Sequence, residues 1–468
     1  MDERTFLDFS KQEFGGMRYL MTKNMNMAEL VTRAEESGKK LARALLLSRL
    51  EEDPRRNPEQ SVCRQCQGKL RIQEAVQRRV INTALGEIEY CRAYGVCDGC
   101  GHTAAPLDEA LGIPAFGPSV EARQKICHAA VVGRSFDSGE EILRVHSGIK
   151  VSAKHVRSIA EREGRSLAEE RGKETVAYRE GQLGVGGGEP TPTLMVVTAD
   201  GGRVQTRALE AKERWKEDKI GIVYDAVAKP QEHAKRGEYE GAKAHTKTYV
   251  ATLESWESMG WMLRLEAQRR GYDKAKTKVF VADGAKHIRE LKNLQFPEAT
   301  FILDWAHAAQ HLSECAKAAF GEGSEEAIRW YEKHRGMLWD GDGEGIIKDL
   351  RRLSERLGPP RDTDTDASPR KILYQNAFSY FPNNKDAIDY PSFRAKGWPI
   401  GSGVAEGSIK QFGLRMKGSE KFWNGLDEDA SVRNPQRTGA EEMLALCALY
   451  HSEDGRWDRH WRRRAQPR

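Results

Sequence analysis

The spacing of hydrophobic and polar positions divides the first part of the chain into helical, extended and linker segments. Residues 26–51 place apolar side chains at helical intervals, and the stretch EEDPRRNPE then breaks this pattern. Residues 61–106 favour short strands, whereas residues 117–175 return to a helical pattern with a break at HSGIKVS. The stretch GQLGVGGGEPTPT at 181–193 is rich in Gly and Pro, which is typical of a linker.

Strands and helices alternate after this linker. Three strands are expected first, in TLMVVTAD (193–200), RVQTRALEA and KIGIVYDAVAK, and the amphipathic helix ESWESMGWMLRLEAQRRG follows them. The apolar runs TKVFVAD (277–283) and TFILD (300–304) predict two more strands, and each leads into a helix. This order is typical of the ribonuclease H-like α/β fold, although other mixed sheets use the same elements. Residues 320–395 have a helical pattern and predict an all-helical insertion.

Composition and charge restrict the class of protein only broadly. The chain has 468 residues, with 75 Lys and Arg against 70 Asp and Glu, and 39% of the residues are hydrophobic. This is enough for packed cores and excludes a collagen-like or wholly disordered chain. No run of roughly 18 apolar residues exists, and the acidic start MDERTF does not suit a signal peptide. We therefore expect an intracellular protein without a membrane partner, whose basic stretches at 394–423 and 457–468 suit a polyanion.

The cysteines are unevenly distributed, because five of the eight fall between Cys63 and Cys100. Four of these form two CxxC pairs, whose thiolates suit a tetrahedral Zn²⁺: Cys63, Cys66, Cys97 and Cys100. The 30 residues between the pairs include RRVINTALGEIEYCRAYGV, which predicts a β-hairpin with its turn near Gly86. A hairpin between two CxxC pairs is the layout of a zinc ribbon. A redox dithiol pair is the alternative, and Cys91 or His102 can each replace a ligand.

The remaining cysteines, Cys127, Cys315 and Cys447, are scattered along the chain, and we expect them to be reduced and buried.

Residues 135–165 predict a helix, a tight turn that contains glycine, and a second helix. Ser152 can cap the second helix, whose start carries Lys154, His155 and Arg157. A helix-turn-helix protein inserts the start of its second helix into the major groove of DNA, so these three residues are candidate DNA contacts. An ordinary helical hairpin is the alternative.

Acidic residues stand where two of the predicted strands end. Asp200 and Asp283 each follow an apolar run and each precede a glycine, which predicts that both lie at one edge of the sheet beside a tight turn. Two carboxylates brought together there repel one another unless a cation lies between them. A third acid can come from Glu406, in a helix predicted to begin after Gly401-Ser402-Gly403. Such a trio can hold Mg²⁺ or Mn²⁺ ions for in-line phosphoryl transfer.

A histidine pair follows the last predicted strand of this region. His307 and His311 are spaced by one helical turn, so they can face one side of a helix and bind zinc together with Asp304 or Glu314. The residue after His307 is alanine, so the HExxH pattern of zinc hydrolases is absent. A supporting role close to the carboxylates is the preferred interpretation.

These motifs together resemble the transposases of ISKra-type insertion sequences, which are relatives of the Mutator-like group with an acidic catalytic triad. The resemblance spans about residues 60–465 and includes the paired CxxC ribbon, TADGGRVQTR, VADGAKHIRELKNLQFPEATFILDWAHAAQHL, GWPIGSGVAEGSIKQFGLRMKG and GRWDRHW. The order of Asp-Gly, Asp-x-x-His and Gly-Ser-Gly-x-x-Glu is the specific part. His287 departs from the family pattern, which usually has tryptophan there.

The resemblance implies roles for individual residues. Asp200, Asp283 and Glu406 match the metal-binding triad. The Asp-x-x-His element, Asp304 and His307, matches an auxiliary motif. A basic motif that would face the DNA backbone is matched by Arg415 and Lys417.

The sequence thus predicts a multidomain α/β DNA transposase with a ribonuclease H-like catalytic domain. Its expected segments are a helical N-terminal segment (1–60), a zinc ribbon (61–106), a helix-turn-helix domain (107–180), the linker (181–193), the first part of the catalytic domain (194–319), the helical insertion (320–395), and the final catalytic helix with a basic tail (396–468).

The expected partners are double-stranded DNA, as terminal inverted repeats and target DNA, and further copies of the chain in a homodimer or higher oligomer. The expected location is the nucleoid in the cytoplasm of a bacterial-type cell. A DNA-binding regulator without catalysis and a zinc hydrolase built on His307 and His311 are the rival hypotheses.

Overall fold

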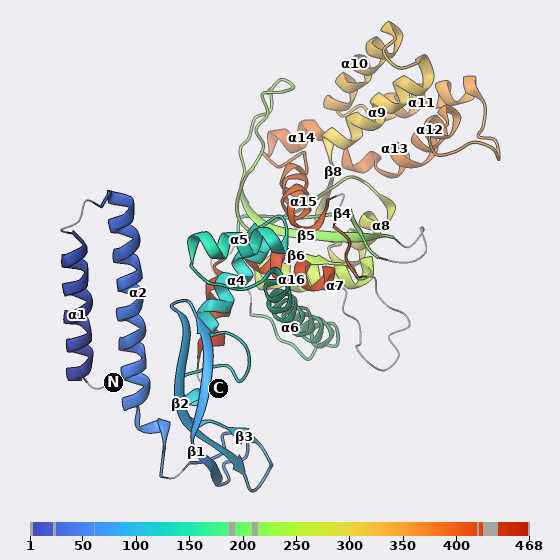
Figure 1. Cartoon of the computed structure of the whole chain (residues 1–468). Helices are drawn as coiled ribbons and strands as arrows, with labels where there is room; N and C mark the ends of the chain where they lie inside the picture. Colours follow the sequence, from blue (N-terminus) through green and yellow to red (C-terminus); the bar gives the residue numbers. More distant parts are fainter. Residues whose placement is uncertain are drawn as a thin grey trace. The chain divides into compact units, whose positions relative to one another are not determined.

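The protein forms two compact units in the computed structural model (Figure 1). The structure describes residues 3–21, 25–59, 61–186, 192–207, 214–418, 421–424 and 439–466. Unit 1 comprises Met1–Ala160 and Gly455–Arg468, and unit 2 comprises Glu161–Asp454. The middle of the predicted linker, residues 187–191, lies outside the described residues. None of the described helices combines the length and the apolar character that crossing a membrane requires.

Unit 1 begins with two helices and a long β-hairpin. Its first elements are α1 (Glu3–Met21), α2 (Met27–Glu52), η1 (Pro54–Arg56), β1 (Leu70–Thr83), β2 (Gly86–Cys97), β3 (Thr103–Ala104) and α3 (Pro106–Ala110). A capping box starts α2, because the Asn26 side chain accepts from the backbone of Glu29 and the Glu29 carboxylate accepts from the backbone of Asn26. The hairpin turn lies at Gly86 as predicted, where φ is +105°.

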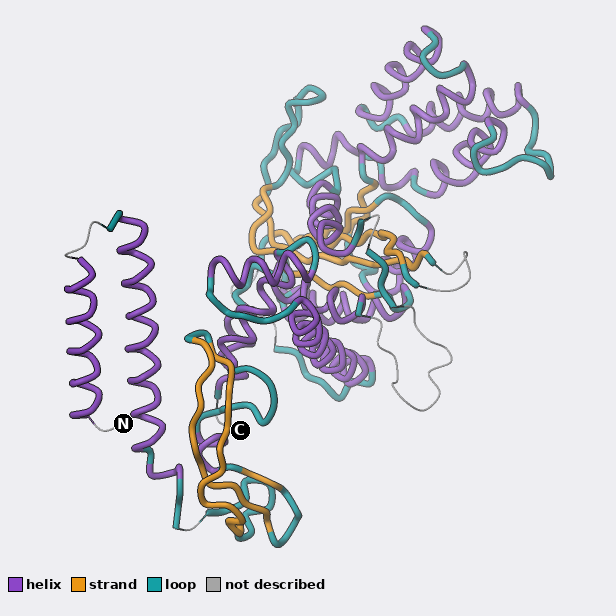
Figure 2. Tube along the Cα trace, viewed as in Figure 1, coloured by secondary structure: helices purple, strands orange, loops and turns teal. Residues whose placement is uncertain are grey.

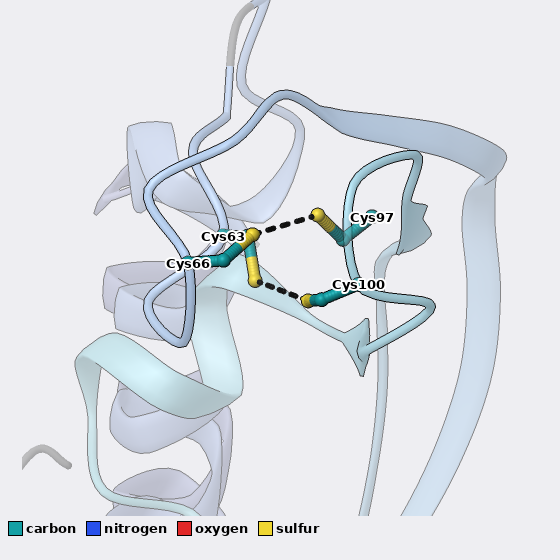
Figure 3. Close-up of side chains that lie close together, drawn as sticks. All are labelled: Cys63, Cys66, Cys97 and Cys100. Atoms are coloured by element: carbon teal, nitrogen blue, oxygen red, sulfur yellow. Dashed lines mark hydrogen bonds between the residues drawn. The ribbon is translucent and has the colours of Figure 1, made fainter.

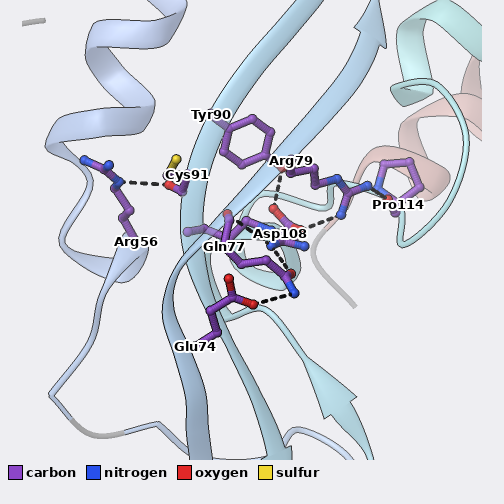
Figure 4. A network of polar contacts seen from close by, with 9 residues as sticks. Arg56, Glu74, Gln77, Arg79, Tyr90, Cys91, Asp108 and Pro114 are labelled. Atoms are coloured by element: carbon purple, nitrogen blue, oxygen red, sulfur yellow. Dashed lines mark hydrogen bonds and ion pairs between the residues drawn. The ribbon is translucent and has the colours of Figure 1, made fainter.

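A buried carboxylate joins α3 to the hairpin (Figure 4). Asp108 of α3 is 4% exposed and accepts hydrogen bonds from Tyr90, Arg79 and Arg92 of the two strands. Burial and the neighbouring carboxylate raise the pKa of Tyr90, so its hydroxyl stays a donor to Asp108. This network fixes the hairpin against the segment that follows the cysteine pairs.

Three helices complete unit 1 together with the end of the chain. These elements are α4 (Val120–Val132), α5 (Phe136–His146), the first part of α6 (Ala153–Arg179), and α17 (Arg456–Ala465). The break predicted at HSGIKVS separates α5 from α6, and Gly148 there has φ +65°. The basic tail forms α17, which packs against α4 and buries Trp461. The sequence prediction assigned this tail to the catalytic domain, whereas in the structure its buried aromatic face joins it to unit 1.

Unit 2 contains a five-stranded mixed sheet. The strands are β4 (Leu194–Gln205), β5 (Trp215–Val227), β6 (Lys243–Thr252), β7 (Thr277–Ala282) and β8 (Thr300–Leu303). Their order is β6-β5-β4-β7-β8, with β4, β5 and β6 antiparallel and β4, β7 and β8 parallel. The first two predicted strands, 193–200 and RVQTRALEA, form one continuous strand, β4, which ends at Gln205. The third predicted strand is β5. Sequence analysis missed β6, which is the third strand of the antiparallel part.

Helices cover both faces of this sheet. Those next to it are α7 (Trp256–Arg269), α8 (Lys286–Gln295), α15 (Gly403–Met416) and α16 (Ala440–His451), whereas α9 (Trp305–Phe320) follows β8 and packs on the helices that come after it. Gly221 of β5 faces Met259 and Leu263 of α7. The opposite face of the sheet meets α15. Tyr249 of β6 pairs with Ile222, whose side chain points away from the α7 face, and the Tyr249 ring packs on Phe412 of α15 at a ring-centroid distance of 5.8 Å. The rest of α6, from Glu161, belongs to unit 2, where Arg171 donates to Ala251 of β6 (2.9 Å).

The chain between α9 and α15 contains helices and turns but no strand, and all of its residues are described (Figure 2). The elements are α10 (Glu325–Trp339), α11 (Gly343–Leu357), α12 (Pro369–Gln375), the π-helix η4 (Asn376–Tyr380), α13 (Phe381–Asn383), η5 (Lys385–Ala387) and α14 (Tyr390–Ala395). An all-helical segment therefore stands where the sequence pattern predicted an insertion. The described part of the chain is a mixed α/β protein with two sheets.

Candidate metal centres and nucleic-acid-binding elements

The two CxxC pairs come together in unit 1 (Figure 3). The sulfur atoms of Cys63, Cys66, Cys97 and Cys100 all lie within 4.8 Å of one another. Cys63 Sγ is 3.7 Å from Cys100 Sγ, and Cys66 Sγ is 3.4 Å from Cys97 Sγ. A tetrahedral zinc with Zn–S bonds of about 2.3 Å needs sulfur–sulfur separations of roughly 3.8 Å. The four cysteines therefore form a cluster that can hold a metal ion such as zinc.

The backbone around the two pairs repeats the same turn. Cys63 O accepts from the amide of Gln67 and Cys97 O accepts from the amide of Gly101. The residue after each second cysteine is left-handed, with φ +60° at Gln67 and +71° at Gly101. Backbone donation, first from the amide of Cys100, lowers the pKa of Cys97 to about 7, which favours the thiolate that a metal binds. Both turns are thus built to present two sulfurs to one ion.

The two alternative ligands lie outside the cluster. Cys91 does not belong to the group of four, and its carbonyl accepts from Arg56 Nε at 2.8 Å. His102 Nε2 is 3.3 Å from a carboxylate oxygen of Glu109. The remaining cysteines of the described chain are buried, as expected.

The predicted recognition helix begins at the expected residue. Lys154 and His155 are exposed in the first turn of α6, and Arg157 is partly buried. Ser152 Oγ lies 3.0 Å from His155 Nδ1. The cap on the backbone comes from a different residue, because the Glu140 carboxylate of α5 accepts from the amide of Ala153 (2.6 Å).

The three predicted acids come from three elements of unit 2. Asp200 lies inside β4, two residues beyond Thr198, where the pairing of β4 with β7 ends. The prediction that a strand and a tight turn meet at Asp200 was therefore wrong, because β4 continues along β5. Asp283 directly follows β7, and its Oδ1 accepts from the amide of Ala285 (2.9 Å). Glu406 lies in the first turn of α15, as the predicted helix start requires.

These acids interact electrostatically. Burial raises the pKa of Asp200 to about 6, and the charges of Asp283 and Glu406 act in the same direction. His307 and the amide of Gly201, which donates to Asp200 Oδ1 at 2.6 Å, oppose the increase. Among the described residues only the four cysteines gather their ligand atoms within 4.8 Å, so the three carboxylates are neighbours at a longer range. A cation between partly buried carboxylates would compensate their like charges. Carboxylate oxygens are ligands that suit Mg²⁺ or Mn²⁺.

Asp304 links the two helices that flank the acids. It is 1% exposed, caps α9 by accepting from the amide of His307 (2.7 Å), and also accepts from the amide of Ser402. Trp305 donates its amide to Ile400 O at 2.9 Å, which adds a second link to the same loop. Because Ser402 is the residue before α15, Asp304 fixes the start of the helix that carries Glu406.

The two histidines of α9 have different surroundings. His307 is close enough to Asp200 to lower its pKa. His311 donates from Nδ1 to the side-chain oxygen of Asn376 at 2.9 Å. Its ring stacks on that of Tyr380 at a ring-centroid distance of 3.7 Å, and burial lowers the pKa of His311. Neither belongs to a group of three or more ligands in the described part of the chain. This geometry gives no support to a zinc site on the pair.

The two basic residues at the end of α15, which were predicted to contact DNA, have different environments. Arg415 is 3% exposed, with its guanidinium 5.3 Å from the ring centroid of Trp423, so it is a buried residue and its burial contradicts a contact with DNA phosphates. Lys417 is partly exposed and lies 3.8 Å from Asp218. Sequence analysis missed Asp218 of β5, which pairs with Gly202, is fully buried, and accepts no hydrogen bond from the described residues.

The chain belongs to the UPF0236 family, which is described as an uncharacterised protein family and whose model matches residues 20–428. The matched region contains the cysteine cluster, α6 and all three predicted acids. No curated protein matches the chain.

Proposed function

We propose that the protein is a DNA transposase of the ISKra type, which binds the ends of an insertion sequence and cuts and joins DNA strands. The observation that carries this proposal is the convergence of Asp200, Asp283 and Glu406. They come from a central strand, the end of its parallel neighbour and a helix more than 120 residues later, and their charges interact.

The architecture of unit 2 supports a ribonuclease H-like catalytic domain. Three antiparallel strands come first, and helices then alternate with two parallel strands added on the other side of β4. Parallel strands end at a common edge, which is where a ligand crevice forms in open α/β sheets. Asp283 directly follows β7, and Asp200 lies two residues beyond the last residue of β4 that pairs with β7, which supports a catalytic site near this edge.

In this mechanism the chain contributes positioning and charge. Bound divalent cations would stabilise the attacking and leaving oxygens of the phosphate, and Asp200, Asp283 and Glu406 would hold them. Asp304 keeps the start of α15 against α9, so that Glu406 stays near the other two acids. The nucleophile is water in cleavage and a freed 3′ hydroxyl in joining.

Unit 1 would supply DNA recognition. Lys154 and His155 are exposed at the start of α6, and Arg462 and Arg463 are exposed on α17 in the same unit. Basic groups of this kind bind phosphates and release counterions, so binding should weaken steeply as salt increases.

The test compares nicking of a plasmid that carries the element in Mg²⁺ or Mn²⁺ for Asp200→Asn, Asp283→Asn, Glu406→Gln and the matched control Glu314→Gln. Glu314 is exposed on α9. We expect the first three variants to lose nicking and joining while they still bind the element ends, and the control to remain active. Normal nicking by Glu406→Gln would refute the triad. End binding without metal-dependent nicking by the unmodified protein would favour a non-catalytic DNA-binding regulator.

A further inference from the structure

A cavity of about 530 Å³ lies between α8 and the helical insertion, beside the acid cluster. Gly284 and Ala285, which directly follow Asp283, line one side of it, and the π-helix η4 lines the other. The Tyr380 hydroxyl of η4 donates to the backbone oxygen of Asp283 at 2.9 Å. This bond fixes the cavity wall to the residue that carries a predicted catalytic carboxylate. Turns of π-helix are frequent at functional sites, which supports a functional role for this side of the cavity.

The lining of the cavity is rich in side-chain amides. Asn293 and Gln375 line it and are exposed, and their side chains make no hydrogen bond to another described residue. Asn383 donates only a long bond of 3.4 Å to Ser379. An unused amide offers a donor and an acceptor side by side, which matches the edge of a nucleobase. The cavity therefore has hydrogen-bonding groups that the protein itself does not use.

Aromatic and basic side chains complete the cavity. His311 and Tyr380 both line it and stack on each other with an interplanar angle of 16°, so one face of each ring is not covered by the other ring. Lys286 and Arg289 also line it, and the Lys286 side chain is 89% exposed. Stacking on rings and a positive charge near the opening are the two features that single-stranded nucleic acid sites share.

We propose that this cavity binds one unpaired nucleotide of the DNA substrate, with its base among the amides and its phosphate near Lys286. The volume falls within the range of roughly 300–1,000 Å³ that small-molecule sites have, and a duplex is too wide to enter it. The nucleotide must therefore leave the base stack, as bases do in enzymes that extrude them. This inference rests on the proposed function, because it assigns the cavity to DNA held next to Asp283.

The test measures binding of the full chain to two single-stranded oligonucleotides of about twelve nucleotides, a length within the usual range of such sites. One is all deoxyadenosine and the other is abasic, so that their phosphate charges are equal. We expect the unmodified protein to bind the first roughly tenfold more tightly. The double variant Asn293→Leu with Gln375→Met should lose most of this preference. The control Gln310→Met, an exposed amide on α9 outside the cavity, should keep it.

A cross-linking experiment locates the base independently of affinity. A thiothymidine oligonucleotide should cross-link to the tryptic peptide 372–385, which carries all of η4 and α13, and the double variant should lose this product. Equal binding of the two oligonucleotides, or a preference that the double variant retains, would overturn the proposal. Base preference without metal-dependent nicking would support the cavity and reject the transposase. Nicking that depends on Asp283, together with equal binding, would reject only the cavity.

Discussion

Asp304 shows how one buried carboxylate can hold two segments together. Its two oxygens accept from the amides of His307 and Ser402. In Asp304→Asn one carboxylate oxygen is replaced by an NH₂ group, which cannot accept a hydrogen bond from the backbone N–H that it faces. The free energy of unfolding should therefore fall by roughly 1–3 kcal/mol. Urea unfolding measures this change. The control is Asp342→Asn, which caps α11 through one bond to Gly345 (2.8 Å) and should change little, because asparagine caps equally well. Equal effects of the two substitutions would contradict the linking role.

The acid cluster predicts an unusual dependence of stability on pH in the absence of divalent metal. Burial, and then the charge of Asp283, raises the pKa of Asp200 from 3.8 to about 6, so the folded state holds a proton that the unfolded state has already released. Stability should therefore fall as the pH rises from about 4 to 6. Asp200→Asn should raise the free energy of unfolding by roughly 2 kcal/mol near pH 7, and this gain should vanish near pH 4.

Thermal or urea unfolding at several pH values, in the presence of a chelator, measures this difference. Glu314→Gln serves as the control, because Glu314 is an exposed acid on α9. A gain for Asp200→Asn that is equal at both ends of the pH range would point to a cause other than ionisation.

At the residue scale, the sequence identified the types of group but not their burial. The stretch 394–423 suggested a basic surface, yet Arg394 packs over Trp339 at 4.0 Å and Arg415 over Trp423, and both are buried. Charge counted along the chain cannot show that a guanidinium lies on an aromatic ring. The cysteines were predictable because their chemistry requires the CxxC spacing.

At the scale of elements, the cysteine cluster should control the folding of the ribbon. Cys97→Ser removes one of four ligands, so the protein should lose its zinc, and the ribbon should lose much of the folding energy that a metal supplies in small units. Elemental analysis of the purified protein measures the zinc content. Cys91→Ser changes a cysteine of the same hairpin outside the cluster, and it should retain the metal. A full zinc content in Cys97→Ser would refute the four-cysteine site.

Elements with continuous apolar patterns were predicted well, and those with interrupted patterns were not. Strands β7 and β8 and the helices after them lie where the pattern predicted them. In contrast, Gly201 and Gly202 indicated a turn but lie inside β4, paired with β5. Glycine is needed there because the side chains of Glu217 and Asp218 occupy the space that a Cβ atom would take. Strand β6 was missed because its first half is exposed or only partly buried and polar.

At the scale of the whole molecule, the C-terminal helix should determine the stability of unit 1. Trp461 is 3% exposed in α17, which packs against α4. Trp461→Ala should therefore destabilise unit 1 by roughly 3–5 kcal/mol. Hydrogen exchange should show lost protection in α4 and unchanged protection in β4. Trp215→Ala, at a site that is 53% exposed at the start of β5, should leave α4 protected. Lost protection in β4 with Trp461→Ala would contradict the division into units.

The contact of α17 with unit 1 also has a consequence for synthesis on the ribosome. Unit 1 is made of two stretches of chain, and all of unit 2 is translated between them. Gly112, with φ +65°, lies against the backbone of Ala465, so this contact cannot form until the last helix has emerged. Unit 2 has all its residues earlier and can fold first. Unit 1, which carries the start of α6, is therefore completed after unit 2 on the nascent chain.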